Sequence, residues 1–154
     1  MTPARTLLIM VILAATLVLA ACGGPKKEEW VASVSALCTS FTTESETMAR
    51  QVVASGGTED PSKMKIIQAS VPQLQKHVAS VRAVPAPEDD AAIAAYLAEG
   101  DKFASVFQQF AAALAASNMT GLQQLAPQLQ ASVQTFNASV AAAGLPTNCG
   151  AEQS

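Results

Sequence analysis

The sequence predicts an all-α fold, an antiparallel up-down-up-down bundle of four helices. Apolar residues recur at spacings of three and four over four separate segments, and glycine, proline or acidic residues bound each segment. The turns between the segments are short, and no segment shows the apolar-polar alternation of a strand. An up-down bundle is the simplest way to bury four such apolar stripes.

The N-terminal segment differs from the rest of the chain and is predicted to be a signal peptide. The segment of residues 1–5 is short and basic, and the uncharged apolar run of residues 6–21 follows it. This run is shorter than the about 20 apolar residues of a membrane-spanning helix, and the helix-breaking sequence at 22–25 ends it. We therefore expect residues 1–21 to be removed.

The end of this signal resembles the lipobox of bacterial prolipoproteins, and the match extends over all four positions, Leu19-Ala20-Ala21-Cys22. The resemblance implies that a signal peptidase recognises Leu19, Ala20 and Ala21, and that two or three acyl chains are attached at Cys22. Each buried methylene contributes about 0.8 kcal/mol, so such a set of chains holds a protein stably on a bilayer. An uncleaved apolar anchor and an ordinary secretory signal are the alternatives.

The residues after the lipidation site bear on localisation. Gly23 is not the aspartate that marks retention at the inner membrane in bacteria with two membranes. The resemblance thus implies an extracytoplasmic protein of the bacterial cell envelope, anchored to the outer membrane or to the outer face of the cytoplasmic membrane. The linker of residues 22–29 is short, so the domain of residues 30–150 should stay near that membrane. Residues 151–154 form a tail.

The first helix is expected from Trp30 to Gly56-Gly57, with one apolar face that Ser45 interrupts. The second should begin at Asp60, an N-cap before Pro61, and it should kink or restart at Pro72. Its stripe alternates between spacings of three and four without a break. The two stripes comprise Trp30, Val34, Leu37, Phe41, Met48 and Val52, then Met64, Ile67, Val71, Leu74, Val78 and Val81.

Pro85-Ala86-Pro87 should end the second helix, and the acidic residues 88–90 suit the N-terminus of the third. The third helix has a wide apolar face that should contact two neighbours. The fourth helix follows a connection at 117–121 and should end at Gly144, a left-handed C-cap. The two faces comprise Ile93, Tyr96, Leu97, Phe103, Val106, Phe107, Phe110 and Leu114, then Leu122, Leu125, Leu129, Val133, Phe136 and Val140.

Lipidation of Cys22 would leave Cys38 and Cys149, of the 3 cysteines, in an oxidising compartment. An up-down bundle brings the start of its first helix and the end of its last to the same end, so a disulfide between them is geometrically reasonable. Such a bond would stabilise the fold by about 4.7 kcal/mol in the chain-entropy model. Two free thiols and a redox site are the alternatives.

The mature chain also resembles the small, alanine-rich helical lipoproteins and secreted proteins of GC-rich bacteria. The residues that carry this resemblance are Trp30, Ala36-Leu37-Cys38 and Gly144-Leu145-Pro146 with Cys149. It implies paired cysteines and no catalytic residue.

Patterns for catalysis and for metal or cofactor binding are missing from the sequence, so no enzymatic activity, metal site or cofactor is expected. His77 is the only histidine and is interpreted as a boundary residue of the second helix. The acidic residues at 59–60 and 88–90 are interpreted as helix caps rather than cation ligands. Removal of residues 1–21 takes one arginine from the chain and leaves a formal net charge of −4, which is unsuited to nucleic acid.

Two hypotheses for function follow. The first is a membrane-anchored, non-catalytic interaction domain for a protein partner that the sequence does not identify. The alternative is a carrier that holds an apolar ligand or lipid between its helices. Methionine and phenylalanine side chains would line that cavity, although such residues at helical spacing more often form a plain core. They are Met48, Met64, Phe103, Phe107, Phe110 and Met119.

Overall fold

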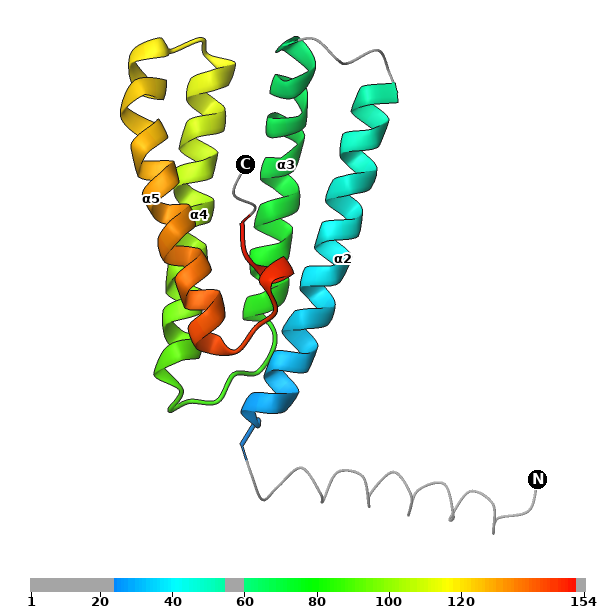
Figure 1. The fold of residues 1–154 in the computed structure, drawn as a ribbon, viewed down its shortest axis with the longest axis vertical. Helices are drawn as coiled ribbons and strands as arrows, with labels where there is room; N and C mark the ends of the chain where they lie inside the picture. Colours follow the sequence, from blue (N-terminus) through cyan, green and yellow to red (C-terminus); the bar gives the residue numbers. More distant parts are fainter. Residues whose placement is uncertain (1–23, 55–59, 152–154) are drawn as a thin grey trace, which may run out of the picture.

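The computed structural model describes residues 24–54 and 60–151. The chain forms four long helices over these ranges, α2 (Lys27–Ala54), α3 (Asp60–Arg82), α4 (Ala91–Ala115) and α5 (Met119–Ala143), and ends in a short 3-10 helix, η1 (Thr147–Cys149). The helices run up, down, up and down (Figure 1). The described ranges contain no strand. The predicted all-α four-helix bundle is confirmed.

Several residues singled out in the sequence lie outside the described ranges. They are the lipobox residues Leu19, Ala20, Ala21 and Cys22, the Gly56-Gly57 pair and Glu59. The expected anchor therefore stays a prediction.

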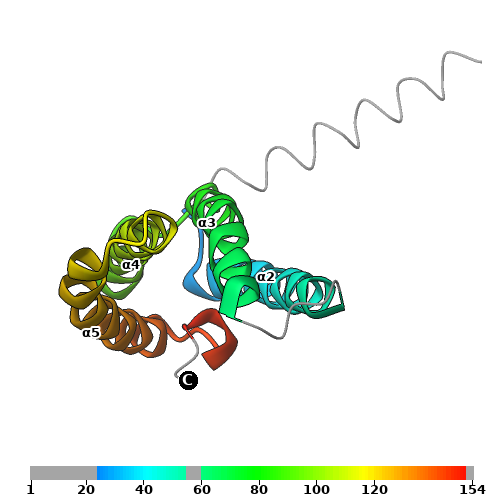
Figure 2. The same ribbon diagram turned by 90° about the horizontal axis from the view of Figure 1, so that it is seen from above.

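The helices pack in the order of the chain. α2 packs on α3, α3 on α4, and α4 most extensively on α5, while η1 contacts both α2 and α5. Seen from above, the four helices form a bent row, and the C-terminal segment lies in the gap between the first helix and the last (Figure 2). One side of the bundle is thus bridged by a short segment instead of by helix-on-helix packing.

α2 begins at Lys27, before the expected start of the domain at Trp30. Glu28 and Glu29 lie in its first turn, where negative charge is favourable. The Lys27 Nζ atom lies 2.9 Å from Asp90 Oδ2, which joins the N-terminus of α2 to that of α4. Residues 27–29 therefore belong to the first helix of the folded domain rather than to the linker expected at 22–29.

α3 runs through Pro72 without a break, so the expected restart at this proline is wrong. The Pro72 side chain is exposed, and α3 packs against both α2 and α4. This packing outweighs the one backbone hydrogen bond that a proline removes. Residues 85–87 lie between α3 and α4, as predicted.

Two helix ends agree with the residues predicted to form them. The Asp90 carboxylate accepts hydrogen bonds from the backbone N–H groups of Ala92 and Ile93, each at 3.0 Å, and caps α4. The hydrogen bond from Lys27, and then these backbone bonds, lower the pKa of Asp90 below its usual value. Gly144 adopts the left-handed conformation (φ 80°, ψ 20°) and ends α5.

Full burial is concentrated at one end of the bundle, which we call the closed end. It comprises the first half of α2, the last turn of α3, the first turns of α4, the last turns of α5 and the segment 144–151. Trp30, Val34, Cys38 and Ile93 are fully buried there, and the other buried residues of this end include Val81, Tyr96, Phe136, Val140, Leu145 and Cys149. At the opposite end, which we call the open end, the large apolar residues of the same stripes are only half-buried.

No helix within residues 24–54 and 60–151 combines the length and the apolar character needed to cross a membrane.

Candidate functional site

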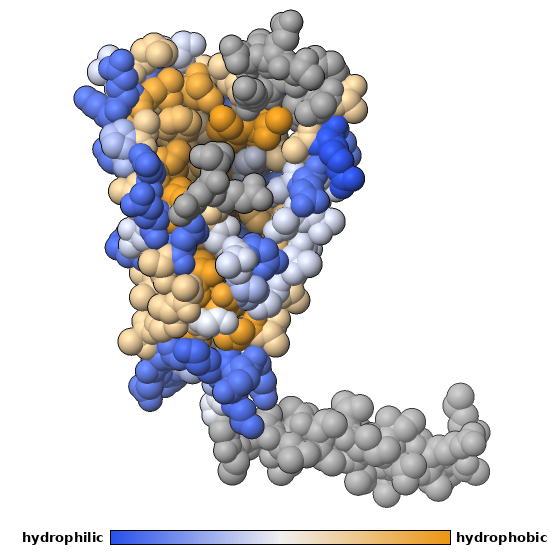
Figure 3. All heavy atoms as spheres, viewed as in Figure 1, coloured by the Kyte–Doolittle hydropathy of each residue, from blue (hydrophilic) through white to orange (hydrophobic). Residues whose placement is uncertain are grey.

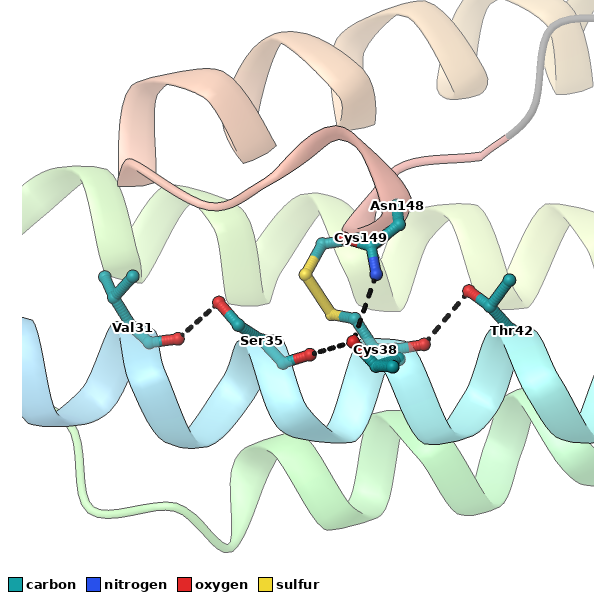
Figure 4. Close-up of a disulfide and its surroundings, with 7 residues drawn as sticks. Val31, Ser35, Cys38, Thr42, Asn148 and Cys149 are labelled. Carbon is teal, nitrogen blue, oxygen red and sulfur yellow. Dashed lines mark hydrogen bonds between the residues drawn. A yellow bond between two sulfur atoms is a disulfide. The ribbon is translucent and has the colours of Figure 1, made fainter.

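A disulfide links Cys38 in the middle of α2 to Cys149 at the end of η1, with the two Cα atoms 5.0 Å apart (Figure 4). The predicted bond is confirmed, and the free-thiol and redox-site alternatives do not apply to this state of the protein. Both cysteines are buried in the closed end, where solvent thiols have poor access. The bond fixes the C-terminal segment against α2.

Asparagine side chains also hold this segment. The Asn137 amide of α5 donates to the carbonyl of Ala151 at 2.9 Å and accepts from its N–H at 2.8 Å. The Asn148 side chain donates to the Thr39 hydroxyl of α2 at 3.3 Å. The segment is therefore attached to both α2 and α5, on the side where these two helices do not pack on one another.

A groove of about 970 Å³ extends from this segment between the helices toward the open end. Small-molecule sites are typically concave, mostly apolar and roughly 300–1,000 Å³ in volume. Apolar atoms are visible between the two helix pairs on the face that carries the C-terminal segment (Figure 3). The α4 and α5 side of the groove contains Leu97, Phe103, Phe107, Leu129, Val133 and Phe136.

A row of aromatic rings leads from the closed end into the groove. Trp30 meets Tyr96 edge-on at 5.8 Å between centroids, and Tyr96 stacks on Phe136 at 5.5 Å. Phe136 then stacks on Phe103 at 5.5 Å with nearly parallel planes, and Phe103 lies 6.1 Å from Phe107. Burial raises the pKa of Tyr96 to about 12. Tyr96, Phe103, Phe107 and Phe136 of this row give the groove one aromatic wall.

The opposite wall carries a second stacked pair. The Phe41 ring of α2 and the His77 ring of α3 lie 4.5 Å apart and nearly parallel. Burial lowers the pKa of His77, and the nearby Glu44 only partly opposes this effect, so the imidazole is uncharged at neutral pH. The half-buried position of His77 agrees with its interpretation as a boundary residue.

Polar side chains in the groove come from α2, α3 and the C-terminal segment. Thr42, Ser45 and Glu46 belong to α2, and Ser70 and Arg82 belong to α3. Ser45 was expected only as an interruption of the apolar stripe. A polar residue on an apolar face was thus the one sequence signal that pointed to an unpacked stretch of α2.

Two of these polar side chains bond to their own helix. The Thr42 hydroxyl donates to the carbonyl of Cys38 at 3.0 Å, and the Ser70 hydroxyl donates to the carbonyl of Ile66 at 2.8 Å. Each hydroxyl hydrogen is already donated to a backbone carbonyl, while each hydroxyl oxygen keeps lone pairs that can accept a hydrogen bond.

The six methionine and phenylalanine residues considered as a cavity lining fall into two groups. Met48, Phe103 and Phe107 line the groove. Met119 is 65% exposed near the start of α5, and neither Met64 nor Phe110 is part of the lining. Helical spacing alone could not separate Met48, Phe103 and Phe107 from Met64 and Phe110, because all five lie on apolar stripes.

Within the described residues, no three histidine, cysteine, aspartate or glutamate side chains gather closely enough to hold a metal ion. Comparison of the chain with protein-family models, with curated proteins and with solved structures finds no match.

Proposed function

We propose that this protein is a membrane-anchored lipoprotein whose helical domain carries an apolar ligand or lipid in the groove between its helices. The observation that carries the proposal is the groove itself, a concave site of about 970 Å³ with one apolar aromatic wall. The lipobox Leu19-Ala20-Ala21-Cys22 supports the anchor.

The groove supports the carrier hypothesis better than it supports the protein interaction domain. A protein partner generally covers about 800 Å² of a broad surface, whereas walls from four helices can surround a small molecule. Burial of roughly ten methylene groups contributes about 8 kcal/mol before the costs of association, enough for useful binding of a hydrocarbon chain.

The groove lies away from the proposed anchor. Cys22 is close in sequence to Lys27, where α2 begins, and Phe41 lies about 21 Å further along the helix axis at about 1.5 Å per residue. The closed end would thus face the membrane. A ligand in the groove would be held beyond the headgroups, where a carrier must shield it from water.

The first experiment is native mass spectrometry of the protein extracted from its own membranes. We expect an apolar adduct on the wild type and a much weaker one on Val133→Trp, because the indole would fill the groove at a half-buried wall position. Gln134→Trp places the same indole on the exposed neighbouring position and is the matched control. An empty wild type, or equal adducts on both variants, would reject the carrier.

The anchor is tested separately by intact mass. A mass equal to residues 22–154 plus acyl groups is expected. A mass that includes residues 1–21, or that includes no lipid, would contradict the proposed lipoprotein. It would not bear on the proposal that the groove carries a ligand.

A further inference from the structure

The groove is chemically two-sided. Its α4 and α5 wall is apolar except for the hydroxyl of Tyr96, while Thr42, Ser45, Ser70 and His77 lie on the α2 and α3 wall. A molecule that fills such a site must have both an apolar part and a polar part, because each buried polar group left without a hydrogen-bond partner costs roughly 1–3 kcal/mol. A pure hydrocarbon would leave the polar wall unused.

The charges of the lining exclude an anionic head. Arg82 is the one cation among the described residues that line the groove. Its guanidinium donates to both carboxylate oxygens of Asp101, with Nε 3.0 Å from Oδ1. Glu46, the other charged side chain in the described lining, offers an anion no counter-charge. A buried anion without a counter-ion is strongly disfavoured.

A cationic head has little to bind either. Glu46 is the only acidic side chain in the described lining, and it is exposed on α2. An exposed ion pair contributes about 0–1 kcal/mol and is screened by salt. The charged groups therefore favour neither sign.

The remaining partners suit a hydroxyl. An uncharged imidazole offers one donor and one acceptor, and the oxygens of Thr42 and Ser70 can accept. A hydroxyl group both donates and accepts, so it can satisfy this set without bringing a charge into the groove.

We infer that the groove takes an uncharged lipid whose hydroxyl-bearing head lies against α2 and α3 and whose hydrocarbon lies against Phe103, Phe107 and Phe136 of α4 and α5. This inference rests on the proposed function and names the class of ligand for the same site. The anchor and the ligand are then separate lipids, the first covalent and outside the groove, the second exchangeable and inside it.

The test is a competition between two probes with the same hydrocarbon chain. The full mature protein is placed in phosphatidylcholine nanodiscs that contain equal mole fractions of monoolein and oleate, in alkaline buffer where oleate is ionised. Native mass spectrometry then reports the ratio of the two adducts. We expect monoolein to exceed oleate by roughly tenfold or more, since the carboxylate loses its hydration without gaining a counter-ion.

A charge variant tests the reason for that preference. Asp101→Asn leaves the Arg82 guanidinium without its counter-charge at the edge of the groove, so the share of oleate should rise several-fold while monoolein binding is unchanged. Both residues are exposed, and loss of the pair should affect stability little. Glu99→Gln removes a similar ion pair, with Lys102 at 2.6 Å, outside the lining and is the matched control.

The outcomes separate the two proposals. Absence of both adducts from the wild type rejects the carrier function, and the ligand class with it. Oleate binding equal to or stronger than monoolein overturns the uncharged class while the carrier stands. An oleate share that stays low in both variants shows that paired Arg82 is not the reason for selection and also overturns the inference, whereas a rise in Asp101→Asn alone supports it.

Discussion

The closed end and the open end of the bundle are built from the same four helices, yet they use their apolar residues differently. At the closed end Trp30, Val34 and Ile93 are at most 1% exposed. At the open end Phe107 and Leu129 belong to equally regular stripes but are only half-buried and line the groove. The periodicity is the same at both ends, so it cannot be the cause of the difference.

The difference in burial between the two ends comes from the segment that follows the four helices. Segment 144–151 fills the space between α2 and α5 at the closed end, and the Cys38–Cys149 bond and the Asn137 amide attach it there. In the described part of the chain nothing comparable joins α2 to α5 at the open end. A strongly attached end allows the helices to separate at the other end without loss of the fold.

Removal of the disulfide should have the largest effect on this comparison. The bond closes a loop with a sequence separation of 111 residues, and the Cys38→Ala, Cys149→Ala double variant should lose about 3–5 kcal/mol of unfolding free energy. Urea denaturation measures the loss. A loss below about 1 kcal/mol would mean that the apolar contacts of segment 144–151 are sufficient without the covalent bond.

Truncation of one aromatic residue at each end compares the two regions directly. Trp30→Ala should cost about 3–5 kcal/mol, because a fully buried indole leaves a cavity. Phe107→Ala should cost about 1 kcal/mol or less, because its half-buried ring already faces open space. Thermal or urea unfolding gives both values. Equal costs would contradict the division into a closed and an open end.

Loss of the cap at Asp90 should weaken the closed end by a smaller amount. Asp90→Ala removes the two bonds to the first turn of α4 and the ion pair with Lys27, whereas Asp89→Ala removes an exposed neighbour. The lowered pKa of Asp90 means that its contribution is fully present above its usual pKa and is lost as the pH falls through the folded-state value. The stability gap between wild type and Asp90→Ala should therefore narrow in acid. A gap independent of pH would contradict the role of the carboxylate charge.

The smallest expected effect is at His77 in the groove. Because burial lowers the pKa of His77, the unfolded chain takes up a proton before the folded one does. Stability should be unaffected above the usual pKa of histidine and should decrease as the pH falls from there to the folded-state pKa. His77→Gln should lack this decrease. An NMR titration of the single imidazole gives the folded-state pKa, and a value at or above the usual one would show that His77 is not desolvated.

A ligand bound in the groove should change the pKa of His77 in the same NMR titration. Monoolein in the groove would exclude water from the Phe41–His77 pair and lower the imidazole pKa further. The Asp90 pKa at the closed end should not change, which makes it the internal control.

Part of the candidate site was present in the sequence. Cys38 and Cys149 could be paired because an up-down bundle puts their segments at one end. Phe103 and Phe107 could be proposed as lining, but Met119, on the same grounds, is exposed. The aromatic pair Phe41–His77 and the Arg82–Asp101 ion pair join residues from different helices, and no periodicity within one helix reveals which partner lies opposite.

The sequence by itself determined the four helices, their order and the helix ends at Asp90 and Gly144, because capping residues, proline, glycine and the spacing of apolar side chains act within a few residues along the chain. It also contained the lipobox-like sequence on which the predicted anchor rests. Only the tertiary structure decided that the apolar stripes close at one end and form a groove at the other. That outcome depends on whether a distant segment, 144–151, fills the space between α2 and α5, and burial is a property of all the surrounding elements together rather than of any one stripe.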